Sequence, residues 1–375
     1  MRRNDFPDLD AVYLDNACMS LRPEQVVDAV REYYTKYPVC PGRGNYELSQ
    51  KATRELEDAR EDIAQFISAD KQDLMFTSGT TESINTVAAS FPADKVIISD
   101  REHNSNLVPW QKHGYEIEVV ETDNDFVSKL DSRVEEGDLV SLVHISNLDG
   151  YEIPIKEVSK VVRENGAYLL VDAAQSIPHK PFSVKDIKPD FVAFSGHKMC
   201  GPSGTGALYT SDRAKDILEP LIVGGGGVNR STLSDHDLKD YPHGMESGLP
   251  NIAGIIGMGE AVRYLDQIGM KKIESHEKKL SNQIYEEIEM IDGVKNVGST
   301  NPSVISLHVG SLDPHQAAIM LDQRDIATRS GMHCVHSWFD KHEVTPTVRA
   351  SLYFYNNRDD IQKFISALKE ISILG

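Results

Sequence analysis

A lysine between a predicted strand and a glycine-rich turn is one of several motifs in the sequence that could carry chemistry. The stretch Ser195-Gly-His-Lys198 follows an apolar run and precedes Met199-Cys-Gly-Pro-Ser-Gly-Thr-Gly206. A lysine enclosed in this way can form a Schiff base with an aldehyde group. A single lysine is more often a solvated surface charge, but the place of this one between a buried-looking strand and a tight loop argues against that interpretation.

A carboxylate ends another predicted strand. Asp172 closes the apolar run Tyr168-Leu-Leu-Val-Asp172, and Gln175 follows three residues later. Ligands of open α/β sheets bind beyond the carboxyl ends of the strands, so a fixed carboxylate there suits a cationic group such as a pyridinium nitrogen. A helix cap or a structural ion pair is the alternative.

Hydroxyl side chains open a predicted helix. The segment 78–83 reads SGTTES, with Thr80 and Thr81 at a strand-to-helix junction. The free N–H groups at a helix N-terminus, together with these hydroxyls, suit a phosphate. Ordinary capping by Ser or Thr explains the same pattern and is the more frequent case.

One cysteine of the four stands in a reactive context. Cys334 follows Arg329-Ser-Gly331 and is adjacent to His333, which favours a reactive thiol over a buried small hydrophobic residue. A metal site formed by His333, Cys334, His336 and His342 is the weaker alternative, because no second ligand pair matches it. None of the cysteines forms a CxxC pair, which favours a reducing compartment and argues against a disulfide framework.

The elements that must position these residues alternate between strand and helix. Apolar positions from Ala52 to Phe66 predict a helix with one buried face, and short apolar runs between helices indicate a largely parallel sheet covered on both sides. After about residue 255 the pattern changes to long helices, which predicts a smaller α+β domain with a strand at 304–309. The strands predicted for the large sheet lie at 73–76, 96–99, 139–145, 168–172, 191–194 and 206–209.

Composition limits the class of protein. The 375 residues carry 39 basic and 58 acidic side chains, a net charge of −19, and 40% are hydrophobic. This is a globular composition with no basic cluster, which argues against a nucleic-acid surface. No apolar h-region follows the N-terminus and no run approaches the length of a membrane span, so we expect a cytoplasmic protein.

Together the motifs resemble the fold-type I pyridoxal-phosphate enzymes of aminotransferase class V, and within them the cysteine desulfurase and selenocysteine lyase branch. They run from residue 13 to the C-terminal helix in the expected order. The short Cys334 segment is similar to the branch that hands sulfur to a dedicated partner protein. Besides those quoted above, the motifs are Tyr13-Leu-Asp-Asn-Ala17, Glu102-His103-Asn-Ser-Asn-Leu-Val-Pro-Trp110, His144-Ile-Ser-Asn147 and Val348-Arg349-Ala-Ser351.

The resemblance implies a cofactor, pyridoxal 5'-phosphate, and a set of residues that hold it. Lys198 would bind the cofactor covalently and later move the Cα proton. Asp172 would pair with the ring nitrogen, Gln175 would reach the ring hydroxyl, and His103 would stack on the ring and assist proton transfer. The residues implied for the phosphate are Thr80, Thr81, Ser195 and His197.

The resemblance also implies the substrate and the sulfur step. Arg349, with Asn147 and Arg329, would bind the carboxylate of L-cysteine. Cys334 would take the sulfur as a persulfide and leave alanine. The implied function is an L-cysteine desulfurase that supplies sulfur for iron–sulfur cluster assembly, with Lys198, Cys334 and His103 catalytic. Alternatives are a selenocysteine lyase, another class V enzyme that does not use Cys334, and a non-catalytic assembly scaffold.

Three positions depart from the family pattern. Leu249 replaces a threonine that usually reaches the cofactor phosphate across a dimer interface, and Met332 and Tyr46 stand where histidines are common. Substrate preference and cofactor affinity are therefore open. The resemblance further implies a homodimer, a sulfur-acceptor or scaffold partner, and no resident metal. We expect an N-terminal segment (1–16) that packs with the small domain, a large cofactor domain (17–255) and a small domain (256–375) that bears Cys334 and Arg349.

Overall fold

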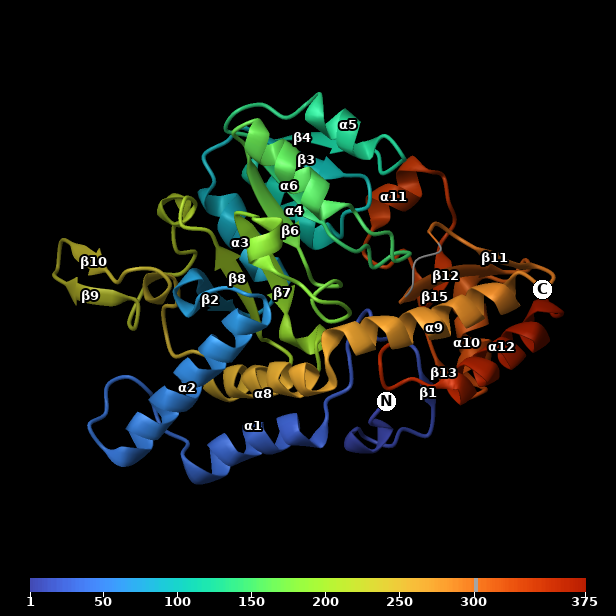
Figure 1. Ribbon diagram of the computed structural model, residues 1–375, viewed down its shortest axis with the longest axis horizontal. Helices are drawn as coiled ribbons and strands as arrows, with labels where there is room; N and C mark the ends of the chain where they lie inside the picture. Colours follow the sequence, from blue (N-terminus) through green and yellow to red (C-terminus); the bar gives the residue numbers. More distant parts are fainter. Residues whose placement is uncertain (300–302) are drawn as a thin grey trace.

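A mostly parallel seven-stranded sheet forms the centre of the larger part of the molecule, in a computed structural model that describes residues 1–299 and 303–375 (Figure 1). β8 runs antiparallel to both of its neighbours, and the other pairs are parallel. The expected largely parallel α/β sheet is confirmed. In spatial order the strands are β2 (Leu74–Thr77), β8 (Gly206–Thr210), β7 (Phe191–Ser195), β6 (Tyr168–Asp172), β5 (Leu139–Val143), β3 (Lys95–Ser99) and β4 (Glu116–Val120).

The predicted strands of this sheet are found within a few residues of their expected bounds, but β4 was not predicted. β4 is an edge strand with mostly exposed or half-buried side chains, so it lacks the continuous apolar run that marks the inner strands. Along β3, Ile97 enters one apolar cluster while Val96 and Ile98 enter another, because successive side chains of a strand point to opposite faces. The sheet therefore separates two apolar layers.

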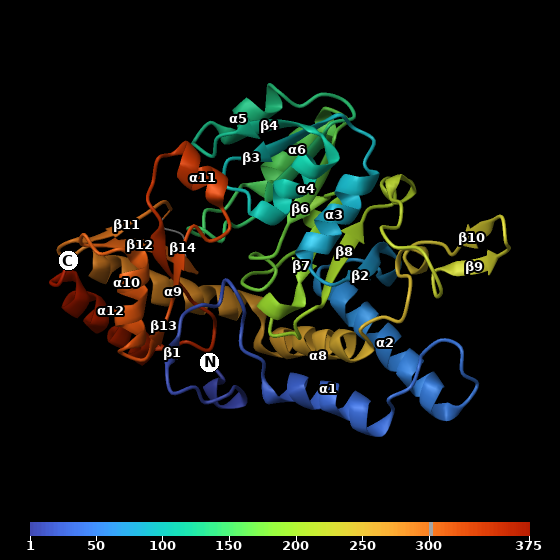
Figure 2. The same cartoon turned by 180° about the vertical axis from the view of Figure 1, so that it is seen from behind.

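Helices cover both faces of the sheet (Figures 1 and 2). One layer contains α2 (Glu47–Phe66), α5 (Phe126–Asp131), α6 (Ile155–Glu164), α7 (Val184–Ile187) and α8 (Ile252–Ile268). The opposite layer contains α3 (Thr80–Ser90) and α4 (Val108–His113). In α2 the buried positions Ala52, Leu56, Ala59 and Ile63 recur at helical spacing, as predicted.

The C-terminal part builds a second, antiparallel sheet of four strands in the order β11 (Val294–Asn296), β12 (Val304–Val309), β15 (Thr347–Ser351) and β14 (Arg329–Gly331). The last helix begins with a capping box in which Asn357 and Asp360 satisfy each other's backbone N–H groups. The N-terminal segment joins this part, because β1 (Val12–Tyr13) pairs with β13 (Ile326–Ala327). The helices here are α9 (Met270–Ile288), α10 (Pro314–Asp322) and α12 (Arg358–Ser372).

The boundary near residue 255 stays a prediction. α8 packs against α1 (Glu24–Lys36) and α2, and its apolar side chains from Ile255 to Ile268 belong to the core of the large sheet. α9 continues from α8 into the second part of the chain, so the two helices link the two sheets.

The remaining elements lie at the periphery. A hairpin of β9 (Val228–Ser231) and β10 (His236–Leu238) projects from the body (Figure 1). Within the described ranges, no helix is both long enough and apolar enough to cross a membrane. Short 3-10 turns lie at η1 (Arg3–Asp5), η2 (Lys71–Asp73), η3 (Asn104–Asn106), η4 (Gly196–Lys198), η5 (Lys215–Ile217) and η6 (His243–Met245).

Candidate active site

One cavity of about 230 Å³ lies beyond the carboxyl ends of the parallel strands, and residues of the small sheet line part of it. All of the site residues predicted from the sequence line this cavity, although they come from segments far apart in the chain. They are Thr80, Thr81, His103, Asn147, Asp172, Gln175, Ser195, His197, Lys198, Arg329, Cys334 and Arg349. Their co-location is a finding, and their individual roles stay predictions.

Hydroxyl groups gather at the N-terminus of α3. The N–H of Thr80 donates to Ser195 Oγ at 2.9 Å, and the two hydroxyls lie 2.8 Å apart. Gly79 has φ of +151°, and a Cβ there would lie 3.1 Å from Ser195 Oγ, so the turn requires glycine. Thr81 and the unpredicted Ser105 bond in the same way at 2.8 Å. This end of the cavity offers hydroxyls and a helix N-terminus to an anion.

A buried acid and a lysine share the next part of the cavity. Asp172 is 3% exposed; burial raises its pKa, while Lys198 and the N–H of Ala174 oppose that shift. Burial in turn lowers the pKa of Lys198, and Asp172 opposes it. Gln175 donates from Nε2 to the carbonyl of Ala17 at 2.7 Å, while its buried Oε1 has no partner among the described residues. The Gln175 oxygen is thus available to a hydroxyl donor.

His103 enters the cavity as a neutral imidazole. Burial, followed by the charges of Lys198 and Arg349, lowers its pKa to about 3. The N–H of Ser105 donates to Nδ1 of His103 at 3.0 Å, so in the neutral ring Nε2 carries the proton. Glu102, buried behind His103, accepts from the N–H of Val143 and fixes this loop to β5.

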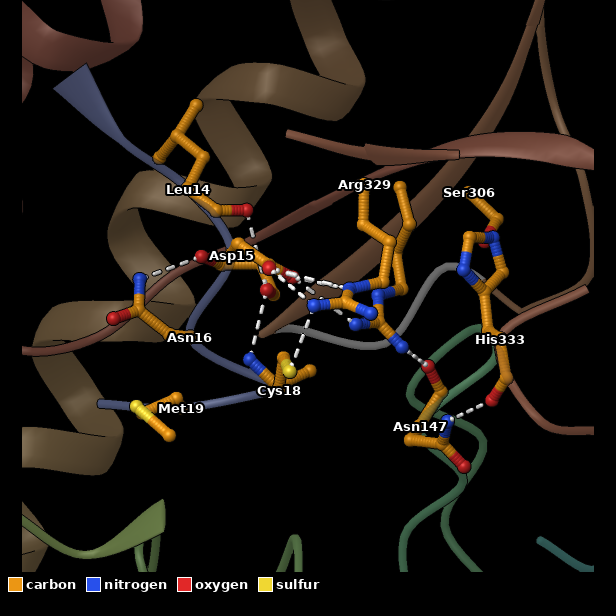
Figure 3. A network of polar contacts seen from close by, with 12 residues as sticks. Leu14, Asp15, Asn16, Cys18, Met19, Asn147, Ser306, Arg329 and His333 are labelled. Carbon is orange, nitrogen blue, oxygen red and sulfur yellow. Dashed lines mark hydrogen bonds and ion pairs between the residues drawn. The ribbon is translucent and has the colours of Figure 1, made fainter. Parts of the chain in front are cut away.

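An acid bridges two arginines at the other end of the cavity (Figure 3). Arg349 is 2% exposed and donates to the carbonyl of Asn147 at 2.9 Å and to Asp15 at 3.3 Å. Its buried Nε has no hydrogen-bond partner within residues 1–299 and 303–375. Arg329 donates to the same Asp15 at 2.9 Å. An unpartnered guanidinium nitrogen in a closed site is a donor for a ligand carboxylate.

Two consecutive left-handed residues hold the Cys334 thiol at the mouth of the cavity. His333 and Cys334 have φ of +50° and +60°, in a region that non-glycine residues rarely occupy. The carbonyl of Cys334 accepts from the N–H of Asn104 at 2.7 Å. Next in the chain, α11 (His336–Lys341) packs Trp338 and Phe339 against Leu148. The exposed thiol therefore sits on a short, anchored turn.

The histidines near Cys334 do not converge on a metal position. His333 bonds to Thr347, His336 to Asn104 and His342 to Asp100, each at 2.8 Å. In the part of the chain that the structure describes, no cluster of three His, Cys, Asp or Glu side chains could hold a metal ion.

Four residues that line or close the cavity were not among the site residues predicted from the sequence. Cys18, Ser105 and His333 line it, and Asp15 joins its two arginines. Asp15 stood inside a quoted motif, but its partners lie 314 and 334 residues away in the chain. No local spacing could reveal these contacts.

The chain belongs to the aminotransferase class V family, whose model matches residues 12–364. A probable cysteine desulfurase of Methanothermobacter thermautotrophicus is 39% identical, over 100% of this chain and 98% of that protein. A cysteine desulfurase of Haloferax volcanii is 38% identical, over 95% of this chain and 88% of that protein. The resemblance derived from the motifs is confirmed.

Solved structures agree with this assignment. An apo cysteine desulfurase from Thermococcus onnurineus superimposes with a TM-score of 0.95 at 36% identity, covering 100% of this chain and 98% of that one. An Escherichia coli cysteine desulfurase gives a TM-score of 0.91 at 28% identity, covering 99% and 97%. The fold is that of fold-type I pyridoxal-phosphate enzymes.

The cavity fits pyridoxal phosphate, the cofactor of this class. An anion site at α3, a buried Asp172, an unpartnered Gln175 oxygen and Lys198 match its phosphate, ring nitrogen, ring hydroxyl and aldehyde in kind. His197, whose pKa burial lowers to about 4, lies beside Lys198 as a neutral donor or acceptor.

Proposed function

We propose that this chain is a pyridoxal-phosphate-dependent L-cysteine desulfurase that forms alanine from cysteine and a persulfide on Cys334. The observation that carries the proposal is one cavity that contains Lys198, the thiol of Cys334 and a guanidinium nitrogen of Arg349 with no partner among the described residues. Relatives named cysteine desulfurase, similar over nearly the whole chain, support the same activity.

Substrate binding follows from the charges around Arg349. The planar guanidinium of Arg349 donates to the substrate carboxylate, and its bonds to Asn147 and Asp15 hold it in one orientation. Arg329 adds positive charge from across Asp15. With the carboxylate held at this end, the amino group of the substrate lies toward Lys198 and the side chain of the substrate lies toward Cys334.

Lys198 and Asp172 divide the proton chemistry. When bound, pyridoxal phosphate supplies an electron sink next to the substrate Cα. Asp172, fixed by the N–H of Ala174, would pair with the ring nitrogen of the cofactor and keep it protonated. Lys198 moves the Cα proton as a neutral amine. Burial lowers the pKa of Lys198 and so favours this uncharged form. Neutral His103 assists from Nε2.

The sulfur step balances with the protein thiol alone. The Cys334 thiolate attacks the substrate sulfur, the new S–S bond forms, and the Cβ–S bond of the substrate breaks. Its electron pair stays on Cβ, which takes up the proton that the Cys334 thiol released and becomes the methyl group of alanine. The products are one alanine and one Cys334 persulfide, with no external oxidant.

Alanine and persulfide formation after addition of L-cysteine to the holoenzyme tests the proposal. We expect alanine from the wild type, sulfane sulfur on the Cys334 peptide, and loss of both in Cys334→Ala. Equal cysteine turnover in Cys334→Ala would instead support a class V enzyme that does not use this thiol. Alanine release from selenocysteine that survives Cys334→Ala would support a selenocysteine lyase.

The proposal also covers the compartment, the oligomeric state and the partner of the enzyme. We place the enzyme in the cytoplasm as a homodimer that passes its sulfur to an acceptor or scaffold protein of iron–sulfur cluster assembly. The exposed Cys334 thiol on a short turn supports direct transfer to a protein partner. A non-catalytic scaffold is disfavoured, because it needs none of Lys198, Asp172 and Arg349.

A further inference from the structure

A second thiol shares the cavity with Cys334. Cys18 lines the same space of about 230 Å³, following the strand β1. The neighbouring backbone is held against the cofactor residues, because the carbonyl of Ala17 accepts from Gln175 and the N–H of Ser20 donates to the carbonyl of His197. Cys18 therefore occupies a fixed position at the site.

A hydrogen bond holds the Cys18 sulfur beside Arg329 (Figure 3). Arg329 donates from Nη2 to Cys18 Sγ at 2.8 Å while it also bonds to Asp15. Asp15 in turn contacts Arg349. The buried Nε of Arg349 has no partner in the described ranges, so it is available as a donor to a ligand carboxylate. The Cys18 thiol therefore lies next to the place where the substrate carboxylate would bind.

The same network reaches the Cys334 turn. Arg349 donates to the carbonyl of Asn147, and the side chain of Asn147 donates to the carbonyl of His333 at 2.7 Å. Burial lowers the pKa of Lys198, and among the groups that oppose this shift are Asp172 and the thiols of Cys18 and Cys334. The thiols of Cys18 and Cys334 thus line one cavity together with Lys198.

We propose that Cys18 is a second sulfur acceptor, which takes the outer sulfur of the Cys334 persulfide by thiol–persulfide exchange. The inference rests on the proposed desulfurase function. The Cys18 thiolate attacks the outer sulfur, a new S–S bond forms on Cys18, and the bond to Cys334 breaks. The Cys334 sulfur leaves as thiolate and takes up the proton lost by Cys18. No electrons are gained or lost overall.

The exchange stores one sulfur on Cys18 and frees the Cys334 thiol to react again. After exchange, Cys334 is again a thiol and can attack a second cysteine before any acceptor arrives. One protomer then carries about two sulfurs, one on each thiol, instead of one. Cys40 offers a matched control, since it is an exposed free cysteine that does not line the cavity.

Mass mapping after a brief pulse of L-cysteine tests the proposal in the holoenzyme. We expect trapped persulfide on both the Cys18 and Cys334 peptides of the wild type and of Cys40→Ser. In Cys18→Ser we expect sulfur on Cys334 alone and about half the alanine burst, and in Cys334→Ala sulfur on neither thiol.

Two results would overturn the relay. Wild-type protein that forms alanine but carries all its sulfur on Cys334, as persulfide or polysulfide, excludes Cys18 as an acceptor. Sulfur on Cys18 in Cys334→Ala would show direct attack on the substrate and refute the order of transfer. If no alanine forms in the wild type, the desulfurase function itself has failed. Because the wild-type map needs no variant, a Cys18→Ser protein that loses its cofactor leaves the test intact.

Discussion

The side-chain amide of Asn147 donates to the backbone carbonyl of His333 at 2.7 Å, which ties the loop after β5 to the turn that carries Cys334. The carbonyl of the same Asn147 accepts from Arg349. One residue therefore sets the position of the sulfur acceptor relative to the residue proposed to bind the substrate carboxylate.

Loss of this amide should slow persulfide formation. In Asn147→Ala we expect the rate of Cys334 persulfide formation to fall about tenfold, as one lost hydrogen bond at a strained turn allows. Single-turnover alanine release measures the rate, and the cofactor absorbance should stay unchanged. Asn165→Ala is the control, because Asn165 makes a similar side-chain bond to Val161 far from the cavity. Equal rates in both variants would contradict the positioning role.

The ion pairs of Asp15 should contribute to stability. Asp15→Asn leaves the buried Arg349 without its carboxylate, and we expect the free energy of unfolding to fall by about 2 kcal/mol in urea titrations. Asp28→Asn is the matched control, because Asp28 pairs with Arg31 on the exposed surface and such pairs contribute little. A loss no larger than in the control would show that Asp15 is dispensable for folding.

Acid should destabilise the fold through buried imidazoles. Burial lowers the pKa of His333 to about 2, whereas the unfolded chain takes up the proton near its ordinary pKa of 6.5. The unfolded state therefore binds more protons below pH 6.5, and stability falls as the pH falls, by about 1.4 kcal/mol per pH unit for this group. His333→Gln should reduce the slope of unfolding free energy against pH by that amount between about pH 5.5 and 4.5.

The exposed His113 supplies the comparison for that slope. The matched variant is His113→Gln, which removes a histidine that is not buried. A His333→Gln slope equal to that of the wild type would mean that His333 is protonated in the folded protein.

Leu249 should limit cofactor affinity if the proposed homodimer forms. Its side chain is 70% exposed, so a substitution there does not disturb the core. Leu249→Thr restores a hydroxyl for the phosphate, and we expect the cofactor Kd to fall about tenfold, as one hydrogen bond to a charged group allows. Leu249→Val has the same shape without the hydroxyl. Equal Kd values for the two variants would place residue 249 away from the phosphate.

Helices and strands could be predicted where the pattern depends on residues close together in the sequence. The apolar runs of β5, β6 and β7 and the one-sided pattern of α2 are set by neighbours in the sequence. β4 was missed, because an edge strand buries too little to show a continuous apolar run. The motif residues around Lys198 and Cys334 were found by their type and spacing.

The sequence by itself indicated the class of fold, most strands of the large sheet and the candidate chemistry-bearing residues, since side-chain type and periodicity are local properties. Only the tertiary structure decided that Asp15 meets Arg329 and Arg349 and that Cys18 meets Arg329, across 311 to 334 residues of chain. These contacts form because β1 pairs with β13 and so brings the N-terminal turn to the small sheet. No spacing within a segment records that pairing, so the second thiol of the cavity becomes visible only in three dimensions.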